Sequence, residues 1–367
     1  MKYIISCFLV LFIINVNAQV VPKIDTIDQR VELISIVYRL AGIEEYTVER
    51  YPDRAFTNYV DLIEDHFRKF ENHEAVKYVK KTLKSKGIRY DAVMSFPICV
   101  TQPPNMTPVV EFSNNILERR WDVKTATKFL SLLNNFYEQT EFEDFYKKNQ
   151  ALYNTVKKRF ALMTSKINQS WYSTFYGYEA KINFGVINAL GIGPYNYNVN
   201  LILPDGQKFA YAVIGAAYLD SLGLPIYDKY LNTILHEFNH SFVNPIVYNN
   251  EKVFKESGEK IYKRFKKMEI ATNDAYGNWQ SMLNESLVRA AVIKYYKDSG
   301  YDQQVIDERL ELENKLGFPW IKELSEKLDY YGSNRNEYPN FESFVPELVI
   351  FFNQVNLEID TYFSRVK

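Results

Sequence analysis

The sequence predicts a mainly helical α+β fold with one small antiparallel sheet. Two patterns support this prediction. On both sides of residues 176–214, apolar residues recur at the three- and four-residue spacing of amphipathic helices. Residues 196–214 instead alternate around a turn, which is the pattern of a β-hairpin. The chain of 367 residues is long enough for one large domain or two moderate ones.

The first 18 residues are predicted to be a secretory signal peptide. Lys2 gives a positive start, residues 3–14 are apolar, and the sequence VNA at 16–18 is typical of a cleavage site. The apolar run is too short to span a bilayer comfortably, and no later segment has the roughly 18 uninterrupted apolar residues of a membrane helix. We therefore expect an exported protein, periplasmic or extracellular, with no membrane span after signal removal.

The composition excludes several classes of protein. A net charge of −1 argues against a nucleic-acid binder, which would need a basic face. A hydrophobic content of 47% argues against a disordered chain. After signal cleavage Cys99 would be the only cysteine, so no internal disulfide can form and the hydrophobic core must supply the stability.

Residues 19–175 are predicted to form an N-terminal helical lobe. Apolar residues within 31–41 fall at helical spacing, and Gly42 ends that run. Another helix begins near Val60, and a long helical stretch is expected over residues 125–166. An irregular loop between them is marked by prolines at positions 97, 103, 104 and 108.

Residues 176–367 are predicted to form a second region, which begins with the sheet. Residues 182–186 have the pattern of a strand. Strands over 196–203 and 209–214 are joined by the turn at 204–207, which contains Pro, Asp and Gly. Helical spacing then dominates to the C-terminus.

The helix after the hairpin carries the sequence HEFNH. His236 and His240 are four residues apart, so their rings project from one side of a helix and can reach one Zn²⁺. Glu237 lies beside them, where its carboxylate can meet a water on the metal. Apolar residues form the opposite face, and Pro245 is expected to end the helix. The alternative is a packed or solvated helix with two incidental histidines.

A third protein ligand is needed, and Glu285 is the best candidate. It lies in a largely apolar helix, where a carboxylate needs a cation or hydrogen bonds. The alternative is an ion pair with Arg289, four residues later. His66 and His73 lie in a charged setting and are expected on a solvated helix face. The carboxylates within 251–267 are likewise expected on a solvated helix.

These residues resemble the gluzincins, zinc metallopeptidases with an HExxH helix of the zincin type and a glutamate ligand on a following helix. The resemblance implies that His236, His240 and Glu285 bind zinc and that Glu237 is the general base. Two departures are visible. Glu285 follows His240 by 45 positions, more than that class usually shows, and Arg289 stands where thermolysin-like enzymes hold an aspartate that orients a ligand histidine. A different acceptor must then orient that histidine.

The chain as a whole resembles an uncharacterised family of exported proteins from Gram-negative bacteria, known only as a domain of unknown function. The resembling stretches span nearly all of the mature chain and are residues 30–42, HEFNHSFVNP at 236–245, NESLVRA at 284–290, and residues 334–345. This resemblance implies a fold and a metal site, but says little about the substrate.

Two further features would support peptide hydrolysis. The hairpin before the motif helix stands where gluzincins place an edge strand, which can bind an extended substrate; an ordinary core hairpin is the alternative. An oxyanion donor is also needed. The loop at 330–338 offers Arg335 and Tyr338, while Tyr195 and Tyr197 are rivals.

We therefore expect an exported zinc peptidase that acts on a peptide or protein substrate. Two alternatives remain open at this stage. The same metal site would also serve a hydrolase of a cell-wall amide or a non-peptide ester. A binding protein with a vestigial metal site is the non-enzymatic alternative, against which the intact Glu237 argues, because a purely structural helix has no need of a carboxylate between two ligands.

Overall fold

The computed structural model describes residues 23–24, 27–47, 57–177, 182–268 and 276–366. The predicted signal peptide at 1–18 lies outside these ranges. Within them, no helix combines the length and the apolar character that crossing a membrane requires.

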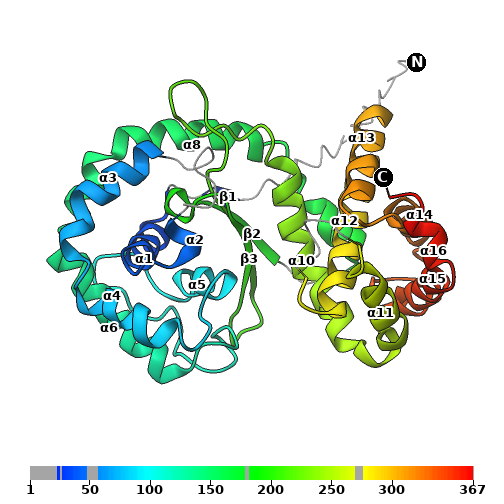
Figure 1. Ribbon diagram of the computed structural model, residues 1–367, viewed down its shortest axis with the longest axis horizontal. Coiled ribbons are helices and arrows are strands. Elements are labelled where there is room, and N and C mark those ends of the chain that lie inside the picture. The colour runs from blue at the N-terminus through cyan, green and yellow to red at the C-terminus, as the bar shows by residue number, and fades with distance from the viewer. Residues whose placement is uncertain (1–22, 25–26, 48–56, 178–181, 269–275, 367) are drawn as a thin grey trace, which may run out of the picture.

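The N-terminal half of the described chain is helical, as predicted. Figure 1 shows α3, α4, α6 and α8 in an arc with α1, α2 and α5 inside it. The bounds are α1 (Gln29–Leu40), α2 (Glu44–Thr47), α3 (Thr57–Phe67), α4 (Glu74–Tyr78), α5 (Asp91–Ser95), α6 (Val123–Gln139), α7 (Phe142–Lys148), α8 (Gln150–Thr164) and α9 (Ser170–Tyr176).

The single helical stretch expected over residues 125–166 is in fact three helices, α6, α7 and α8. Asp122 begins α6 by accepting a hydrogen bond from the N–H of Thr125. Glu141 separates α6 from α7, because its backbone is left-handed, with φ 55°. A single residue with this backbone conformation leaves the helical spacing of the apolar residues intact. The periodicity alone therefore does not show the break.

The sheet comprises β1 (Lys23–Ile24), β2 (Ile182–Asn188), β3 (Asn196–Ile202) and β4 (Lys208–Ile214), in the order β1-β2-β4-β3. The predicted hairpin is confirmed, since β3 and β4 are antiparallel. The sheet as a whole is mixed rather than antiparallel throughout, because β2 pairs parallel with β4. After β2 the chain runs in the opposite direction along β3, which lies two places away in the sheet. β4 then lies between β2 and β3.

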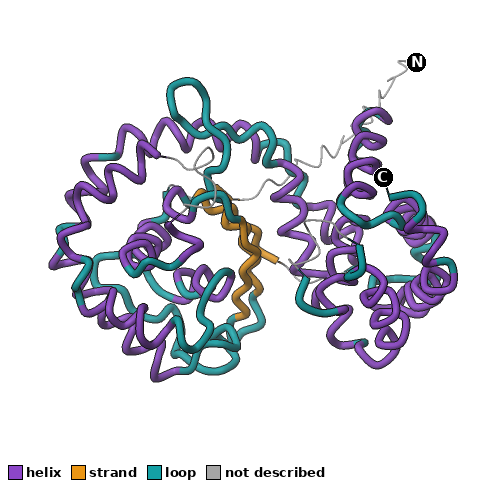
Figure 2. The backbone as a smooth tube through the Cα atoms, viewed as in Figure 1, coloured by secondary structure: helices purple, strands orange, loops and turns teal. Residues whose placement is uncertain are grey.

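Helices dominate the rest of the chain, which confirms the mainly helical α+β class. They are α10 (Leu231–Asn249), α11 (Glu251–Phe265), α12 (Trp279–Asp298), α13 (Gln303–Lys315), α14 (Ile321–Ser333), α15 (Val345–Leu357) and α16 (Ile359–Phe363). Figure 2 shows the strands between the arc of N-terminal helices and α10.

The motif helix α10 does not end at Pro245, contrary to the sequence prediction, but continues for one further turn. Proline has no N–H, so one main-chain hydrogen bond to Ser241 is lost. Pro245 is exposed, and the next residues, Ile246 and Val247, are buried. Burial of these side chains therefore holds the last turn in place.

Aromatic packing joins the two predicted regions. The ring of Trp171 on α9 lies 5.1 Å from that of Tyr295 on α12, and the ring of Tyr172, also on α9, stacks on Phe242 of α10 at 5.7 Å. The buried apolar residues form one connected cluster. The domain boundary between residues 175 and 176 stays a prediction. The sheet contacts helices that precede this boundary in the sequence as well as helices that follow it.

A buried carboxylate ties α1 to α3 and to the segment that follows β2. Glu32 Oε1 accepts a hydrogen bond from the N–H of Leu190 at 2.7 Å, and Oε2 accepts one from the hydroxyl of Tyr59 on α3 at 2.9 Å. Glu32 has no exposed surface. Burial raises its pKa to about 7, although the two hydrogen bonds act in the opposite direction.

We expect Glu32 to make the protein less stable as the pH rises from 4.5 to 7. Over that range the folded protein keeps the Glu32 proton while the unfolded chain loses it, which lowers the free energy of unfolding by about 3 kcal/mol. Glu32→Gln removes this contribution, since its amide does not titrate. Urea unfolding at pH 5 and pH 8 measures it: the wild type should lose stability relative to the variant. Parallel profiles would contradict the assignment.

Candidate metal centre

Two packed helices carry the candidate metal ligands. His236, Glu237 and His240 lie on α10, and Glu285 lies in the second turn of α12. Asn278 begins α12 by accepting a hydrogen bond from the N–H of Ser281, which sets the start of this helix. α10 and α12 pack directly against each other. Helix packing therefore brings Glu285 to the two histidines.

The three donor groups lie close enough together to hold one metal ion. The Nε2 atoms of His236 and His240 lie 3.1 Å apart. Glu285 Oε1 lies 3.2 Å from His240 Nε2, and Oε2 lies 3.5 Å from His236 Nε2. Ligand bonds of about 2.05 Å at tetrahedral angles place neighbouring donors about 3.3 Å apart. Among the described residues these three form the group that could hold a metal ion.

The orientation of His240 is set by a neighbour on the same helix. Asn244 Oδ1 lies 3.0 Å from His240 Nδ1, so the amide oxygen can accept the Nδ1 proton and leave Nε2 directed at the other ligands. This amide supplies a hydrogen-bond acceptor for a ligand histidine, which Arg289 cannot provide in place of the aspartate of thermolysin-like enzymes. The i, i+4 spacing from His240 to Asn244 is a signal in the sequence that could have identified it.

The electrostatics of the cluster also suit a cation. Burial lowers the pKa of His240, but the hydrogen bond and charge of Glu285 outweigh it and raise the pKa to about 9. Burial raises the pKa of Glu285, but His236 and His240 hold it well below the usual range. Without a metal, a proton on the imidazoles balances the carboxylate, and a bound metal must displace that proton.

Glu285 contacts Arg289 as well as the two histidines. Its Oε2 lies 3.3 Å from the Arg289 guanidinium, and the Tyr276 hydroxyl donates to the same oxygen at 3.4 Å. Arg289 also donates to the Tyr276 hydroxyl at 3.0 Å and pairs with the buried carboxylate of Glu313. The guanidinium therefore contacts the same carboxylate that faces the two histidines.

Glu237 faces a cavity of about 470 Å³ whose wall also includes the two histidines and Glu285. The main-chain N–H of Asn198 on β3 lies near this carboxylate and acts to lower its pKa. Burial raises the pKa of Glu237, and the neighbouring histidines offset only part of this effect. The carboxylate is thus placed beside the metal ligands but is not one of them.

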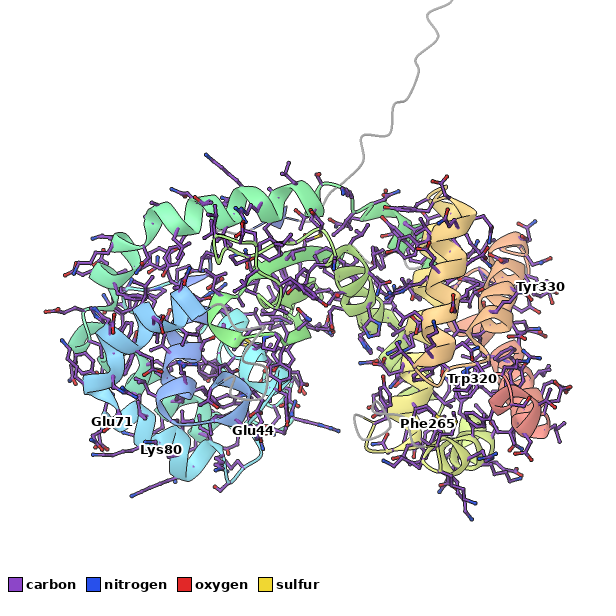
Figure 3. All side chains as sticks on the ribbon, turned by 45° about the horizontal axis from the view of Figure 1, so that its top comes forward. Glu44, Glu71, Lys80, Phe265, Trp320 and Tyr330 are labelled. Carbon is purple, nitrogen blue, oxygen red and sulfur yellow. The ribbon has the colours of Figure 1, made fainter. Side chains whose placement is uncertain are left out.

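The cavity lies where the N-terminal and C-terminal parts of the molecule meet. Asp91 of α5 lines one side, and Ser281 and Glu285 of α12 line the other. In Figure 3, Glu44 marks the N-terminal body and Phe265 the C-terminal body, with α10 among the elements that join them. Both bodies therefore contribute walls to the candidate site.

The structure does not bring Arg335 or Tyr338 to the cavity. Arg335 donates to the main-chain carbonyls of Phe175 and Pro339, each at 2.6 Å, and so anchors the C-terminal loop to α9. Tyr338 packs against Phe344, with ring centres 4.9 Å apart. These contacts assign both residues to packing, and the predicted role as oxyanion donors receives no support.

Other tyrosines line the cavity instead. Of the two rivals, Tyr197 is a lining residue and Tyr195 is not. Tyr248 and Tyr276 also line it, and sequence reasoning missed both. Tyr248 continues the face of His240 at the i+8 position of α10, a spacing that could have revealed it. Tyr276 precedes the start of α12, and no local pattern marks it.

The other two histidines do not line the cavity, but both are half-buried against aromatic rings rather than on a solvated helix face. His66 Nε2 lies 2.8 Å from the carbonyl oxygen of Thr140. His73 begins α4, where Nδ1 accepts a hydrogen bond from the N–H of Ala75. The carboxylates of α11 that were predicted to lie on a solvated helix are exposed, namely Glu251, Glu256 and Glu259.

A family model described as a domain of unknown function (DUF4932) matches residues 24–351. The chain belongs to this family. Comparisons with curated proteins and with solved structures give no match. The membership confirms the resemblance to an uncharacterised family over most of the chain, and the matched range contains every residue of the candidate metal centre. The DUF4932 description names no chemistry, so the gluzincin resemblance stays a prediction.

Proposed function

We propose that this protein is an exported zinc-dependent hydrolase that cleaves peptide bonds. One observation carries the proposal: His236, His240 and Glu285 converge closely enough to hold one metal ion, with Glu237 beside them on the same cavity. Two histidines and a glutamate form the ligand set of catalytic zinc sites that keep one position open. Structural zinc sites instead favour four closed positions, usually with cysteine.

The chemistry divides between the metal and Glu237. Zn²⁺, when bound, lowers the pKa of a water to about 7 and polarises a carbonyl group. Glu237 is positioned to accept the proton of the attacking water and to deliver it to the leaving amine. Because burial raises its pKa, Glu237 is a better base than an exposed carboxylate. Asn198 of β3 lines the same cavity beside Glu237.

The edge of the sheet supports a peptide substrate. Just beyond the two ends of β3, the carbonyl of Tyr195 accepts a hydrogen bond from the N–H of Gly215, and the N–H of Leu203 donates one to the carbonyl of Gln207. Odd-numbered positions of β3 therefore form the main-chain hydrogen bonds with β4. Even-numbered positions therefore direct their main-chain groups to the other edge. The N–H of Asn198, which reaches Glu237, follows this pattern.

No described strand pairs with that second edge of β3. An extended peptide could add there through main-chain hydrogen bonds, in the manner of β-strand addition. The scissile bond would then lie near Glu237, because Asn198 and Glu237 are in contact. This position is the reason to prefer a peptide over an isolated ester as substrate.

Zinc content and cleavage specificity test the proposal together. The purified mature protein is expected to hold about one zinc per chain and to cut members of a peptide library. Cell-wall fragments and simple esters serve as competing substrates in the same assay. Absence of zinc from correctly folded protein would overturn the proposal. Bound zinc with cleavage of only the wall fragments or esters would keep the hydrolase and reject the peptidase.

A further inference from the structure

A second hollow, of about 390 Å³, lies between α10 and the end of the β-hairpin. It shares no lining residue with the metal cavity. Its apolar lining comes from three strands and α10, namely Ile182, Ile202, Phe209, Phe242 and Pro245. The two charged residues that line it, Lys208 and Glu342, have opposite signs. The hollow therefore suits an uncharged apolar group.

Hydrogen bonds fix where this hollow lies relative to the catalytic residues. Asn198 Nδ2 donates to Ser241 Oγ, and Ser241 Oγ donates to Asn200 Oδ1, both at 2.9 Å. Four residues of α10 advance about 6 Å, as do two residues of β3. Helix and strand thus run side by side, with Glu237 next to Asn198 and Ser241 next to Asn200.

The hollow begins at the end of this row of contacts. Asn200 and Ser241 line its near side, and Ile202 lines it one step further along β3. Ile202 is 51% exposed, while Ile182 is half-buried. Apolar surface therefore stays accessible beside the same strand edge that the proposed peptide would follow. Covering such surface is favourable by about 25 cal/mol per Å².

We infer that this hollow binds an apolar side chain of the substrate at a position remote from the cleaved bond. The inference rests on the proposed peptidase function. A peptide extended along β3 advances about 3.3 Å per residue, and the hollow lies two to four strand residues beyond Asn198. The bound side chain is therefore about two to four residues from the scissile bond. A subsite this far away selects extended internal sequences rather than short dipeptides.

The substitution Ile202→Glu tests the inference, because Ile202 is exposed enough for the change to leave the fold intact. A peptide library first locates the preferred apolar position, and two peptides with Leu or Ala there are then compared. We expect the wild type to favour the Leu peptide in kcat/KM by about 10-fold or more. Ile202→Glu should bring the ratio close to one. Ile202→Trp, which narrows the hollow without adding charge, should also reduce the ratio.

Leu222→Glu is the matched control, since Leu222 is 71% exposed and does not line the hollow. It should keep the wild-type ratio, and circular dichroism should show the same helical content for all variants. An unchanged ratio in both Ile202 variants, or wild-type cleavage without any remote apolar preference, overturns the inference and leaves the peptidase proposal standing. A zinc-loaded wild type that cuts no peptide overturns both.

Discussion

Glu237→Gln is expected to lower the rate of peptide hydrolysis by about 10²- to 10⁴-fold, the range for loss of a general base. The amide has the size of the carboxylate and can occupy the same place beside Asn198 in the cavity wall. It cannot take up a proton from water or hand one to the leaving amine. Zinc should stay bound, because His236, His240 and Glu285 are unchanged.

The measurement combines single-turnover cleavage of the best library peptide with zinc analysis of the same sample. Glu259→Gln makes the same chemical change on the exposed face of α11 and should behave as the wild type. Zinc-loaded Glu237→Gln that cleaves at the wild-type rate would show that another group is the base. Loss of zinc from this variant would instead indicate that Glu237 is a ligand, contrary to its position in the cavity.

Glu285→Gln is expected to weaken zinc binding by more than about 100-fold. Loss of a residue that merely supports a ligand typically costs 10- to 100-fold, and Glu285 is itself one of three ligands. The neutral amide removes the negative charge that the two imidazoles face at 3.2 and 3.5 Å. The Arg289–Glu313 pair stays in place and should preserve the packing around α12.

Zinc affinity is measured by competition with a chelator, and unfolding is measured with and without zinc. A metal that binds only the folded state at 100 times its Kd adds about 2.7 kcal/mol to the free energy of unfolding. This increment should largely disappear in Glu285→Gln and persist in Glu259→Gln. Equal zinc affinity in the wild type and Glu285→Gln would reject Glu285 as a ligand and leave the ion pair with Arg289 as its role.

The features that the sequence predicted correctly depend on short-range geometry. A hairpin is specified by two alternating runs and the turn at 204–207 between them. The relation of His236 to His240 follows from the pitch of one helix, as does the placement of Glu237. Glu285 was identified less directly, from a carboxylate in an apolar helix that needed a partner.

The features that were missed or misassigned depend on long-range packing. Arg335 and Tyr338 have suitable chemistry for an oxyanion donor, but their loop packs on α9 rather than on the cavity. The mixed sheet arises because β4 inserts beside β2, a choice that strand periodicity does not encode. Tyr276 contacts Glu285 because of the way in which the chain enters α12 and α12 packs in the fold.

The sequence by itself therefore determined the α+β class and the local half of the candidate site, which is the HEFNH helix with two candidate ligands and a candidate base. Only the tertiary structure decided that Glu285, 45 positions later, meets His236 and His240 at coordination spacing. It also decided that Asp91 and β3 form the remaining walls. The physical reason is that helical pitch acts over a few residues, whereas a metal site closes only when separate elements pack together.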